Sequence, residues 1–293
     1  MIKILNTNIT KTVFLSLCFV SFVSFALKDV AAQGTPRRII SLVPNVTEIL
    51  FAIGAGPQVV AVSTYDVEPP EVRSLPTVGA LVDPDTERII ALRPDLVITY
   101  GSQADLQTQL KAVSIPFFAY RHGGLDHIMV TMRALGQRTG HVEQGDRVAR
   151  ALETAIDAVR KSVAGKPRPT TLLVFGREPG SLRNIYASAG KGFLHDMLTV
   201  AGGEDVLKDI AKESAQVSTE TILARRPDVI IELHAANRLN EADLRAVLDP
   251  WSALSSVPAV RNKRVIILTG SGLTVPGPRV IDGLERMARA LHP

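Results

Sequence analysis

The sequence contains one cysteine, Cys18, and it lies in a segment that the mature protein is expected to lose. Basic residues at positions 3 and 11 precede an apolar stretch at 13–27. That stretch is shorter than the roughly 20 residues of a membrane span, and small residues at 30–32 suit a signal peptidase. We therefore expect a signal peptide over residues 1–32, cleaved after Ala32. An uncleaved anchor and a lipid on Cys18 are the alternatives, although Leu17 is larger than the residue a lipoprotein signal places before its cysteine.

Without residues 1–32 the chain has no thiol, which suits an oxidising compartment. A cysteine nucleophile, a thiolate zinc site and an iron–sulfur cluster are thereby excluded from the mature protein. An excess of charge of one sign is also lacking, because 30 basic and 28 acidic residues remain and they are dispersed along the chain. No basic run alternates with aromatic residues, so we expect no nucleic-acid partner.

Catalytic motifs are absent as well. The sequence has no Gly-x-Ser-x-Gly elbow, no Walker loop and no Gly-x-Gly-x-x-Gly after its first predicted strand. Glu178, Tyr186 and His195 can be imagined as an acid–base set, but their spacing matches no known chemistry. We therefore do not expect an enzyme, and we keep an envelope enzyme and an adhesion scaffold only as alternatives.

What the sequence does contain is an internal repeat. The segment 86–98 (TERIIALRPDLVI) recurs at 219–231 as TETILARRPDVII. Each copy predicts a capping threonine, a short amphipathic helix, a Pro-Asp stop and a buried β-branched strand. The repeat indicates two related halves.

Both halves alternate strand and helix, which predicts an α/β fold with parallel sheets covered on both faces. In the first half we expect strands at 38–42, 59–63, 96–100 and 116–120, and helices at 47–53, 86–92, 105–113 and 125–139. In the second half we expect strands at 171–175, 229–233 and 264–268, and helices at 192–201, 219–225, 241–247 and 278–291.

A long amphipathic helix is predicted between the halves at 142–163, with apolar residues at helical spacing and charges between them. It ends at the glycine- and proline-rich segment 165–169, and its composition is that of a stiff strut rather than of a flexible linker. We expect two doubly wound lobes, at 36–140 and 168–293, joined by one long rigid helix at 141–165. The alternative is a helix that packs on one lobe alone.

Several short motifs occur in the order typical of a known family. They are the opening at 38–48, Ser63-Thr64-Tyr65, the two repeat blocks, the 201–206 turn and Pro278-Arg279. With them, nearly the whole mature chain resembles the helical-backbone (class III) solute-binding proteins of bacterial ABC importers for iron chelates and cobalamin, and in particular the cobalamin-binding type. The resemblance implies a periplasmic protein, monomeric, with a ligand cleft between two lobes, that delivers its ligand to a dimeric permease in the inner membrane.

The family docks on its permease through one exposed glutamate on each lobe, and Glu87 and Glu220 fall at those positions of the repeat. Contacts between carboxylates and arginines are charge-assisted and directional, which suits the orientation of such a complex. The alternative is that each glutamate only stabilises the start of its helix. That alternative does not explain why both copies are acidic.

The ligand site is expected in loops at the strand ends, where aromatic surface and a few polar groups would hold a flat chelate. The candidate ligand-binding residues are Pro44, Asn45, Tyr65, Leu81, Tyr100, Arg121, His122, Arg177, Tyr186 and Arg279. Of these, Tyr65 and Arg279 match the family's ligand-facing positions. Leu81 and the Ser214 region fall where the cobalamin-binding relatives would show tryptophans. Trp251, the only tryptophan, is expected to pack inside its lobe.

The arginines at 121, 177 and 279 would give the cleft a positive lining, which favours an anionic ligand; alternatively they are solvated charges at its rim. His122 could ligate a metal or be ordinary polar surface. The remaining histidines show no pairwise spacing that builds a first shell, so a carrier of free zinc or manganese is not expected. We expect no cofactor, and a bound corrinoid first, with haem or a ferric siderophore as the alternative.

Overall fold

The computed structural model describes residues 34–234 and 239–293, so the predicted signal peptide lies outside the described residues. The chain divides into two compact units, 1–36 and 37–293, and the following description concerns the second. Among the described residues, no helix combines the length and the apolar character needed to cross a membrane.

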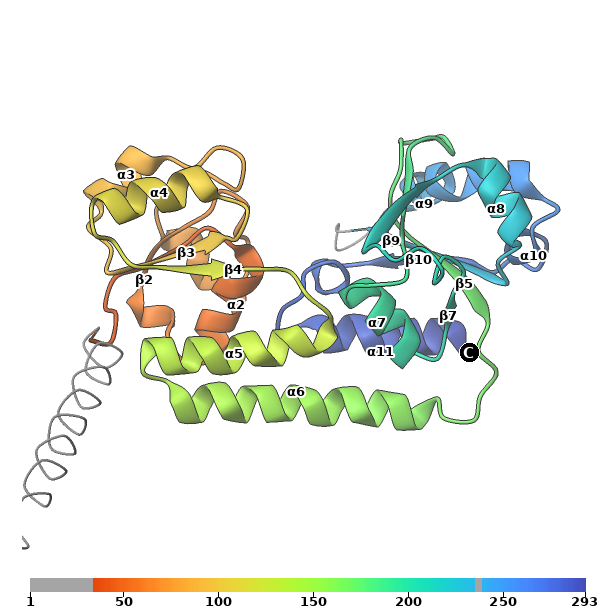
Figure 1. Cartoon of the computed structure of the whole chain (residues 1–293). Coiled ribbons are helices and arrows are strands. Elements are labelled where there is room, and N and C mark those ends of the chain that lie inside the picture. Colours follow the sequence, from red (N-terminus) through yellow and green to blue (C-terminus); the bar gives the residue numbers. More distant parts are fainter. Residues whose placement is uncertain (1–33, 235–238) are drawn as a thin grey trace, which may run out of the picture. The chain divides into compact units, whose positions relative to one another are not determined.

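The first lobe is built on a parallel sheet in the order β2-β1-β3-β4 (Figure 1). Its strands are β1 (Ile39–Ser41), β2 (Val59–Val62), β3 (Leu96–Tyr100) and β4 (Phe117–Tyr120). Its helices are α2 (Pro44–Ala52), α3 (Thr86–Ala91), α4 (Ala104–Ala112) and α5 (Leu125–Thr139), with 3₁₀ turns η1 (Gly56–Gln58) and η2 (Pro70–Ser74). The central strands β1 and β3 are almost wholly buried, as expected for β-branched runs covered on both faces.

The second lobe is built on a mixed sheet in the order β10-β9-β5-β6-β8, with β7 beside β5. Its strands are β5 (Thr170–Gly176), β6 (Ile185–Ser188), β7 (Glu204–Asp205), β8 (Ser214–Val217), β9 (Val229–His234) and β10 (Val265–Thr269). Its helices are α7 (Phe193–Val200), α8 (Thr219–Arg225), α9 (Glu241–Leu248), α10 (Pro258–Arg261) and α11 (Val280–Leu291), with turns η3 (Asp249–Leu254) and η4 (Ser271–Leu273). Strands β6 and β8 run antiparallel to their neighbours and were not predicted.

The repeat forms the same local structure twice, with one correction to its caps. Helix α3 is capped by Asp85, whose carboxylate accepts from Arg88 N at 2.9 Å, and α8 is capped by Ser218, whose hydroxyl accepts from Thr221 N. The threonines predicted as caps occupy the first helical position instead. The aspartate that follows each helix ties the strands together, since Asp95 accepts from the backbone of Arg38 at 2.8 Å.

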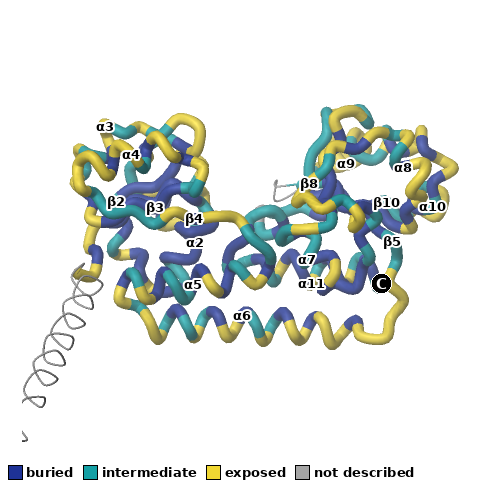
Figure 2. Tube along the Cα trace, in the orientation of Figure 1, coloured by how far each residue is buried: buried dark blue, intermediate teal, exposed yellow. Residues whose placement is uncertain are grey.

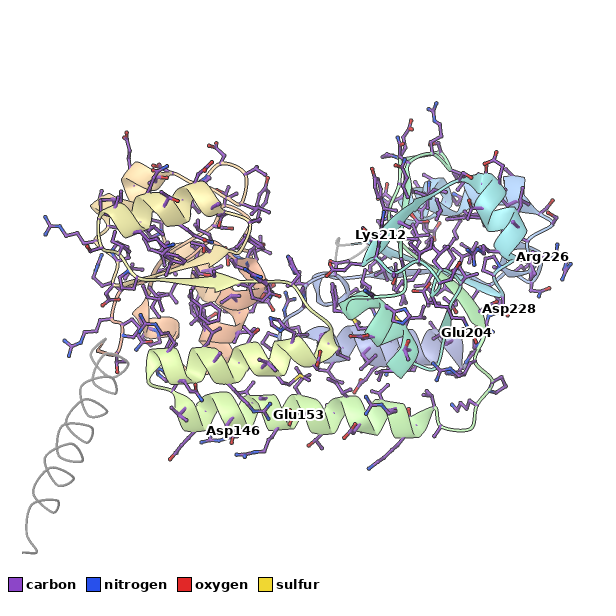
Figure 3. The ribbon with its side chains drawn as sticks, in the orientation of Figure 1. Asp146, Glu153, Glu204, Lys212, Arg226 and Asp228 are labelled. Carbon is purple, nitrogen blue, oxygen red and sulfur yellow. The ribbon has the colours of Figure 1, made fainter. Side chains whose placement is uncertain are left out.

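The predicted long helix is α6 (Val142–Ser162), and it is one member of a helical layer with α5 and α11 (Figure 1). Buried residues recur along its inner face while its outer face is exposed, as Figure 2 shows. A glycine pair allows α5 and α6 to approach closely, because a Cβ on Gly145 would lie 2.9 Å from the carbonyl oxygen of Met132 and 3.1 Å from the Cα of Gly136. Arg133 of α5 pairs with Asp146 at 3.2 Å and with Glu153 at 2.8 Å, both on α6 (Figure 3).

The helical layer shares one continuous apolar core with both lobes. The core includes Leu50 of α2, Met132 of α5, Ile156 of α6, Met197 of α7 and Leu284 of α11. Pulling the lobes away from this layer would expose that core to water, at a cost proportional to the apolar area. The long helix α6 that joins the lobes therefore also packs in a layer with α5 and α11. The α/β fold class predicted from the sequence is confirmed.

Candidate ligand-binding cleft

Four rings form an aromatic wall at the carboxyl end of the first sheet: Tyr100, Tyr120, His122 and His127. The Tyr120 ring lies edge-on to His122 at 5.2 Å and to Tyr100 at 6.3 Å, and the Tyr100 and His122 rings are tilted at 5.8 Å. His127 completes the wall, 6.1 Å from Tyr120. Such packing holds each ring in one orientation, which is what a rigid contact surface for a flat ligand requires.

His122 of the aromatic wall lines a hollow of about 240 Å³ to which both lobes contribute. From the first lobe come His122 and Gly123, and from the second come Phe175, Gly192, Phe193, Leu194, Glu213, Ser214 and Thr274. Gly192 has a left-handed backbone (φ +85°), and a Cβ there would meet the Glu213 side chain at 3.1 Å. The glycine thus lets Glu213 lie over the start of α7, where its charge acts on both His122 and Tyr120.

Burial determines the protonation of this wall. It raises the pKa of Tyr120 to about 12 and raises the pKa of Tyr100, so both stay neutral phenols. Partial burial of the ring also lowers the pKa of His122, against an opposing effect of Glu213. His122 is therefore neutral near pH 7, and a neutral imidazole carries a lone pair that can bind a metal.

A polar cluster lies next to the wall on the first lobe. Burial raises the pKa of Asp66 to about 6 against the opposing effects of Thr47 and Ser63, and the nearby charge of Glu48 adds to the rise. Asp66 accepts from the Ser63 backbone at 2.9 Å. Glu48 itself pairs with Arg279 of the second lobe, Oε1 to Nη2 at 2.6 Å.

The predicted residues of the first lobe lie around this region. Pro44 and Asn45 were expected in a loop, but they form the first turn of α2, where proline is well suited because it has no amide hydrogen to satisfy. Asn45 is buried, while Tyr65 is 69% exposed and Leu81 is 39% exposed. Arg121, which follows β4, is exposed.

Arg177 does not fit the expected positive lining. Its guanidinium and the Glu232 carboxylate are 3.0 Å apart with only 4% of either side chain exposed. It also donates to the carbonyl oxygens of Ser181 at 2.7 Å and Val247 at 2.6 Å, and it lies over the Trp251 ring. All of these contacts lie within the second lobe, so the prediction that Arg177 lines the cleft is wrong.

Tyr186 is also outside the hollow. It lies on β6 with 44% of its surface exposed, opposite Gln216 of β8. Trp251 is buried as predicted and donates to Glu232 at 2.9 Å.

The imagined acid–base set is not assembled. His195 contacts Asp205 at 3.2 Å. Ser188 donates its hydroxyl proton to the same carboxylate oxygen at 3.0 Å, so these three side chains do not form a serine–histidine–aspartate triad either. Glu178 pairs with Arg183 instead. Within residues 34–234 and 239–293, no group of three His, Cys, Asp or Glu side chains is arranged to hold a metal ion.

The two glutamates of the repeat occupy equivalent positions, each two residues after the cap of its helix, and both are exposed. Hydrogen bonds from Ser218 lower the pKa of Glu220, so it stays ionised. In Figure 1, α3 and α8 lie on the side of the sheets away from α5 and α6.

Sequence reasoning missed several residues of the site. Tyr120 was read only as the end of a strand, Glu48 only as part of a motif, and Glu213 and Phe193 were not singled out. The position of Tyr120 at the end of a predicted strand was a signal, because the last residue of a strand reaches the loop edge where ligands bind.

Two α/β lobes on a common helical layer, with a hollow lined from both sides, are the architecture of a solute-binding protein. The chain belongs to the periplasmic binding protein family, whose model matches residues 39–271. The resemblance inferred from the sequence is confirmed.

Among its relatives, the vitamin B12-binding protein of Yersinia pestis is 32% identical over 208 residues, 70% of this chain and 72% of the relative. The ABC transporter substrate-binding lipoprotein YvrC of Bacillus subtilis, itself uncharacterized, is 26% identical over 91% of this chain and 83% of its own. The solved vitamin B12 binding protein BtuF of Vibrio cholerae superposes with a TM-score of 0.74 at 26% identity, covering 88% of this chain and 97% of that one. The heme-binding RhuT of Roseiflexus gives a TM-score of 0.73, also at 26% identity, over 87% and 98%.

Proposed function

We propose that this protein captures cobalamin or a related corrinoid in the periplasm and delivers it to the permease of an ABC importer. The observation that carries the proposal is a hollow shared by both lobes, lined by His122 of the aromatic wall on one lobe and by Phe175 and Phe193 on the other. Rings on two sides suit a broad, flat ligand. A hollow of about 240 Å³ cannot enclose a macrocycle, so the ligand lies across it with one edge seated inside.

The charges near the cleft favour a corrinoid over haem. Of the three arginines expected to bind an anionic ligand, Arg177 is buried and Arg279 is paired with Glu48. Haem carries two carboxylates that need such partners, whereas the periphery of cobalamin carries mainly amides. The hydrogen-bonding groups of these amides can find partners in neutral side chains such as Tyr100 and in the carboxylate of Glu213.

Haem remains the second candidate because of one feature, the neutral His122 at the edge of the hollow. Its imidazole could bind the iron directly. A ferric siderophore is the third ligand of this class, and it would use the same hollow.

Delivery is proposed to occur through Glu87 and Glu220, which would dock on arginines of the two permease subunits.

We further propose a monomer with lobes at 36–140 and 168–293 and a connecting helix at 141–165, released from a signal peptide over residues 1–32. A lipid anchor is not part of the proposal, although the relative YvrC is a lipoprotein by name. The mass of the mature protein from a native host distinguishes a free amino terminus at residue 33 from an acylated one.

Titration of the mature protein with cyanocobalamin and, separately, haemin tests the ligand. We expect saturable one-to-one binding of cyanocobalamin with a perturbed corrin spectrum, and at most weak binding of haemin. A haemin complex with a shifted Soret band, together with no response to cyanocobalamin, would show that the ligand is haem and not a corrinoid. If neither compound binds, both of these ligand proposals fail and a ferric siderophore is the remaining candidate.

A further inference from the structure

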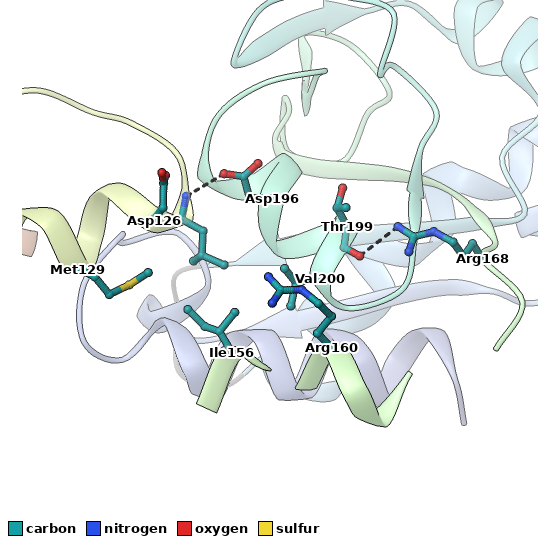
Figure 4. A pocket seen from close by; sticks show the side chains of 9 residues that line it. Asp126, Met129, Ile156, Arg160, Arg168, Asp196, Thr199 and Val200 are labelled. Carbon is teal, nitrogen blue, oxygen red and sulfur yellow. Dashed lines mark hydrogen bonds between the residues drawn. The ribbon is translucent and has the colours of Figure 1, made fainter. Parts of the chain in front are cut away.

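Among the described residues, at least three polar contacts join the lobes in addition to the shared apolar core. Asn45 donates its side-chain amide to Pro276 O at 3.2 Å, and the Leu125 backbone donates to Asp196 at 2.8 Å (Figure 4). The third is the pair of Glu48 and Arg279, which are 231 residues apart in the sequence. None of the three was predicted from the sequence as an interlobe contact.

The Glu48–Arg279 pair is the strongest of them. Arg279 donates Nε to one carboxylate oxygen at 2.8 Å and Nη2 to the other at 2.6 Å, a two-bond geometry that fixes direction as well as distance. Glu48 is only 8% exposed, and Arg279 is the cationic partner of its buried carboxylate. The pair holds the pKa of Arg279 above its usual value, chiefly through the hydrogen bonds to Glu48.

The surroundings of the pair are open rather than tightly packed. A hollow of about 330 Å³ lies beside it, lined from the first lobe by Phe51, Glu68 and Pro69 among others and from the second by Pro278. The pair borders open space, although residues next to it in the sequence, Ile49 of α2 and Val280 of α11, belong to the buried apolar core. The ion pair adds a directional polar contact to that packing.

The pair is also connected to the ligand wall. Glu48 lies one turn after Asn45 on α2. Asn45 donates to Pro276 O and lies near Tyr120, where it lowers the pKa of the phenol against the larger effect of burial. Arg279 directly precedes Val280, the first residue of α11, and α11 belongs to the helical layer. A change of cleft width would move α2 relative to the start of α11, so it would strain the pair.

We infer that Glu48 and Arg279 form an interlobe latch that sets the width of the cleft and must open before ligand leaves. Arg279, which the sequence suggested as a ligand contact, is on this account a positioning residue. The inference rests on the proposed function for its consequence, ligand retention, but the latch itself is testable without any ligand.

The absence of cysteine from the mature chain allows a direct test by spin labelling. Labels at Gln109→Cys on α4 and Ala224→Cys on α8, both exposed positions on opposite lobes, report the interlobe distance by double electron–electron resonance. In the ligand-free protein, Glu48→Gln is expected to broaden the distance distribution and shift its mean. The double reversal Glu48→Arg with Arg279→Glu is expected to restore a narrow distribution.

The matched control is Asp209→Asn, which removes a two-bond carboxylate–arginine pair with Arg225 inside the second lobe. It should leave the distribution unchanged. Arg279→Lys keeps the positive charge but loses the two-bond geometry of the guanidinium. It is the substitute variant if Glu48→Gln fails to fold, and it should broaden the distance distribution to an intermediate degree. An unchanged distribution in the folded latch variants, or equal broadening in the control, would overturn the latch.

For the ligand, stopped-flow measurement with cyanocobalamin should show dissociation about tenfold faster in Arg279→Lys, with association little changed, because such substitutions act mainly on the off-rate. Tenfold slower association with unchanged dissociation would contradict the latch. If the wild type does not bind cyanocobalamin, the ligand proposal fails, while the distance measurement still decides the latch.

Discussion

Asp66 gives a pH dependence to the stability of the protein. Burial raises the pKa of its carboxyl to about 6, well above its value in an unfolded chain. The native state therefore holds this proton more tightly, so the contribution of Asp66 to stability is complete below about pH 4 and is lost as the pH rises through about 6. With partial exposure taken into account, we expect a loss of about 2 kcal/mol.

Asp66→Asn should remove that loss. Thermal melts at pH 4.5 and pH 7.5 should show a smaller difference between the two pH values in the variant than in the wild type. A variant that is less stable at pH 7.5 would mean that ionised Asp66 is favourable in the fold, against this account.

Arg177 was misassigned from the sequence because its partner lies far from it in the chain. That partner, Glu232, is 3% exposed and accepts from Arg177, His234 and Trp251. Arg177→Ala leaves this carboxylate buried without its arginine partner, so we expect about 3 kcal/mol lower stability by urea denaturation, with ligand affinity unchanged. Arg183→Ala, which breaks the exposed pair with Glu178, should cost less than about 1 kcal/mol. Equal costs for the two variants would show that burial of the ion pair does not matter.

At the scale of elements, the close crossing of α5 and α6 depends on two glycines. A methyl group on Gly145 would press on the carbonyl of Met132, so Gly145→Ala should lower stability by about 1–3 kcal/mol despite the better helix propensity of alanine. Gly176→Ala is the control, because a Cβ there meets nothing within 4 Å. Thermal denaturation of the two variants tests the contrast, and a stabilised Gly145→Ala would show that the helices can move apart at little cost.

The sequence predicted most elements because their signals are local. Helix α5 was predicted at its observed bounds, and α6 within one residue of its end. Their amphipathic patterns, and residues such as Gly140 that end α5, belong to the segments themselves. Strands β6 and β8 were missed because they are short, contain serine or glutamine, and are defined by pairing with each other. The interior partner of Arg177 could not be predicted either, because Glu232 lies 55 residues away.

For the site, the ends of the predicted strands indicated where ligand-binding residues should lie. This rule pointed to Tyr100, His122 and Asn45, which lie near one another or near the hollow. The residues that the second lobe adds, such as Glu213 and Phe193, depend on how the lobes face each other, and no local pattern carries that information.

At the scale of the whole molecule, binding and delivery should be separable. Glu87→Lys with Glu220→Lys changes two exposed residues that are not among those lining the hollow. Ligand affinity should be unchanged while uptake into cells falls at least about tenfold, because charge reversal turns two attractive contacts with the permease into repulsive ones. Glu71→Lys, another exposed acidic residue of the first lobe, is the control and should leave uptake intact. Lost affinity in the double variant would place these glutamates in the binding site instead.

The location of the ligand is tested most directly by hydrogen–deuterium exchange of the mature protein with and without saturating cyanocobalamin. The account predicts slower exchange in both lobes at once, at residues 120–123 beside the aromatic wall and at 192–194 and 213–214 across the hollow. Slower exchange confined to one lobe, or saturable binding with no change in these three segments, would contradict a site between the lobes.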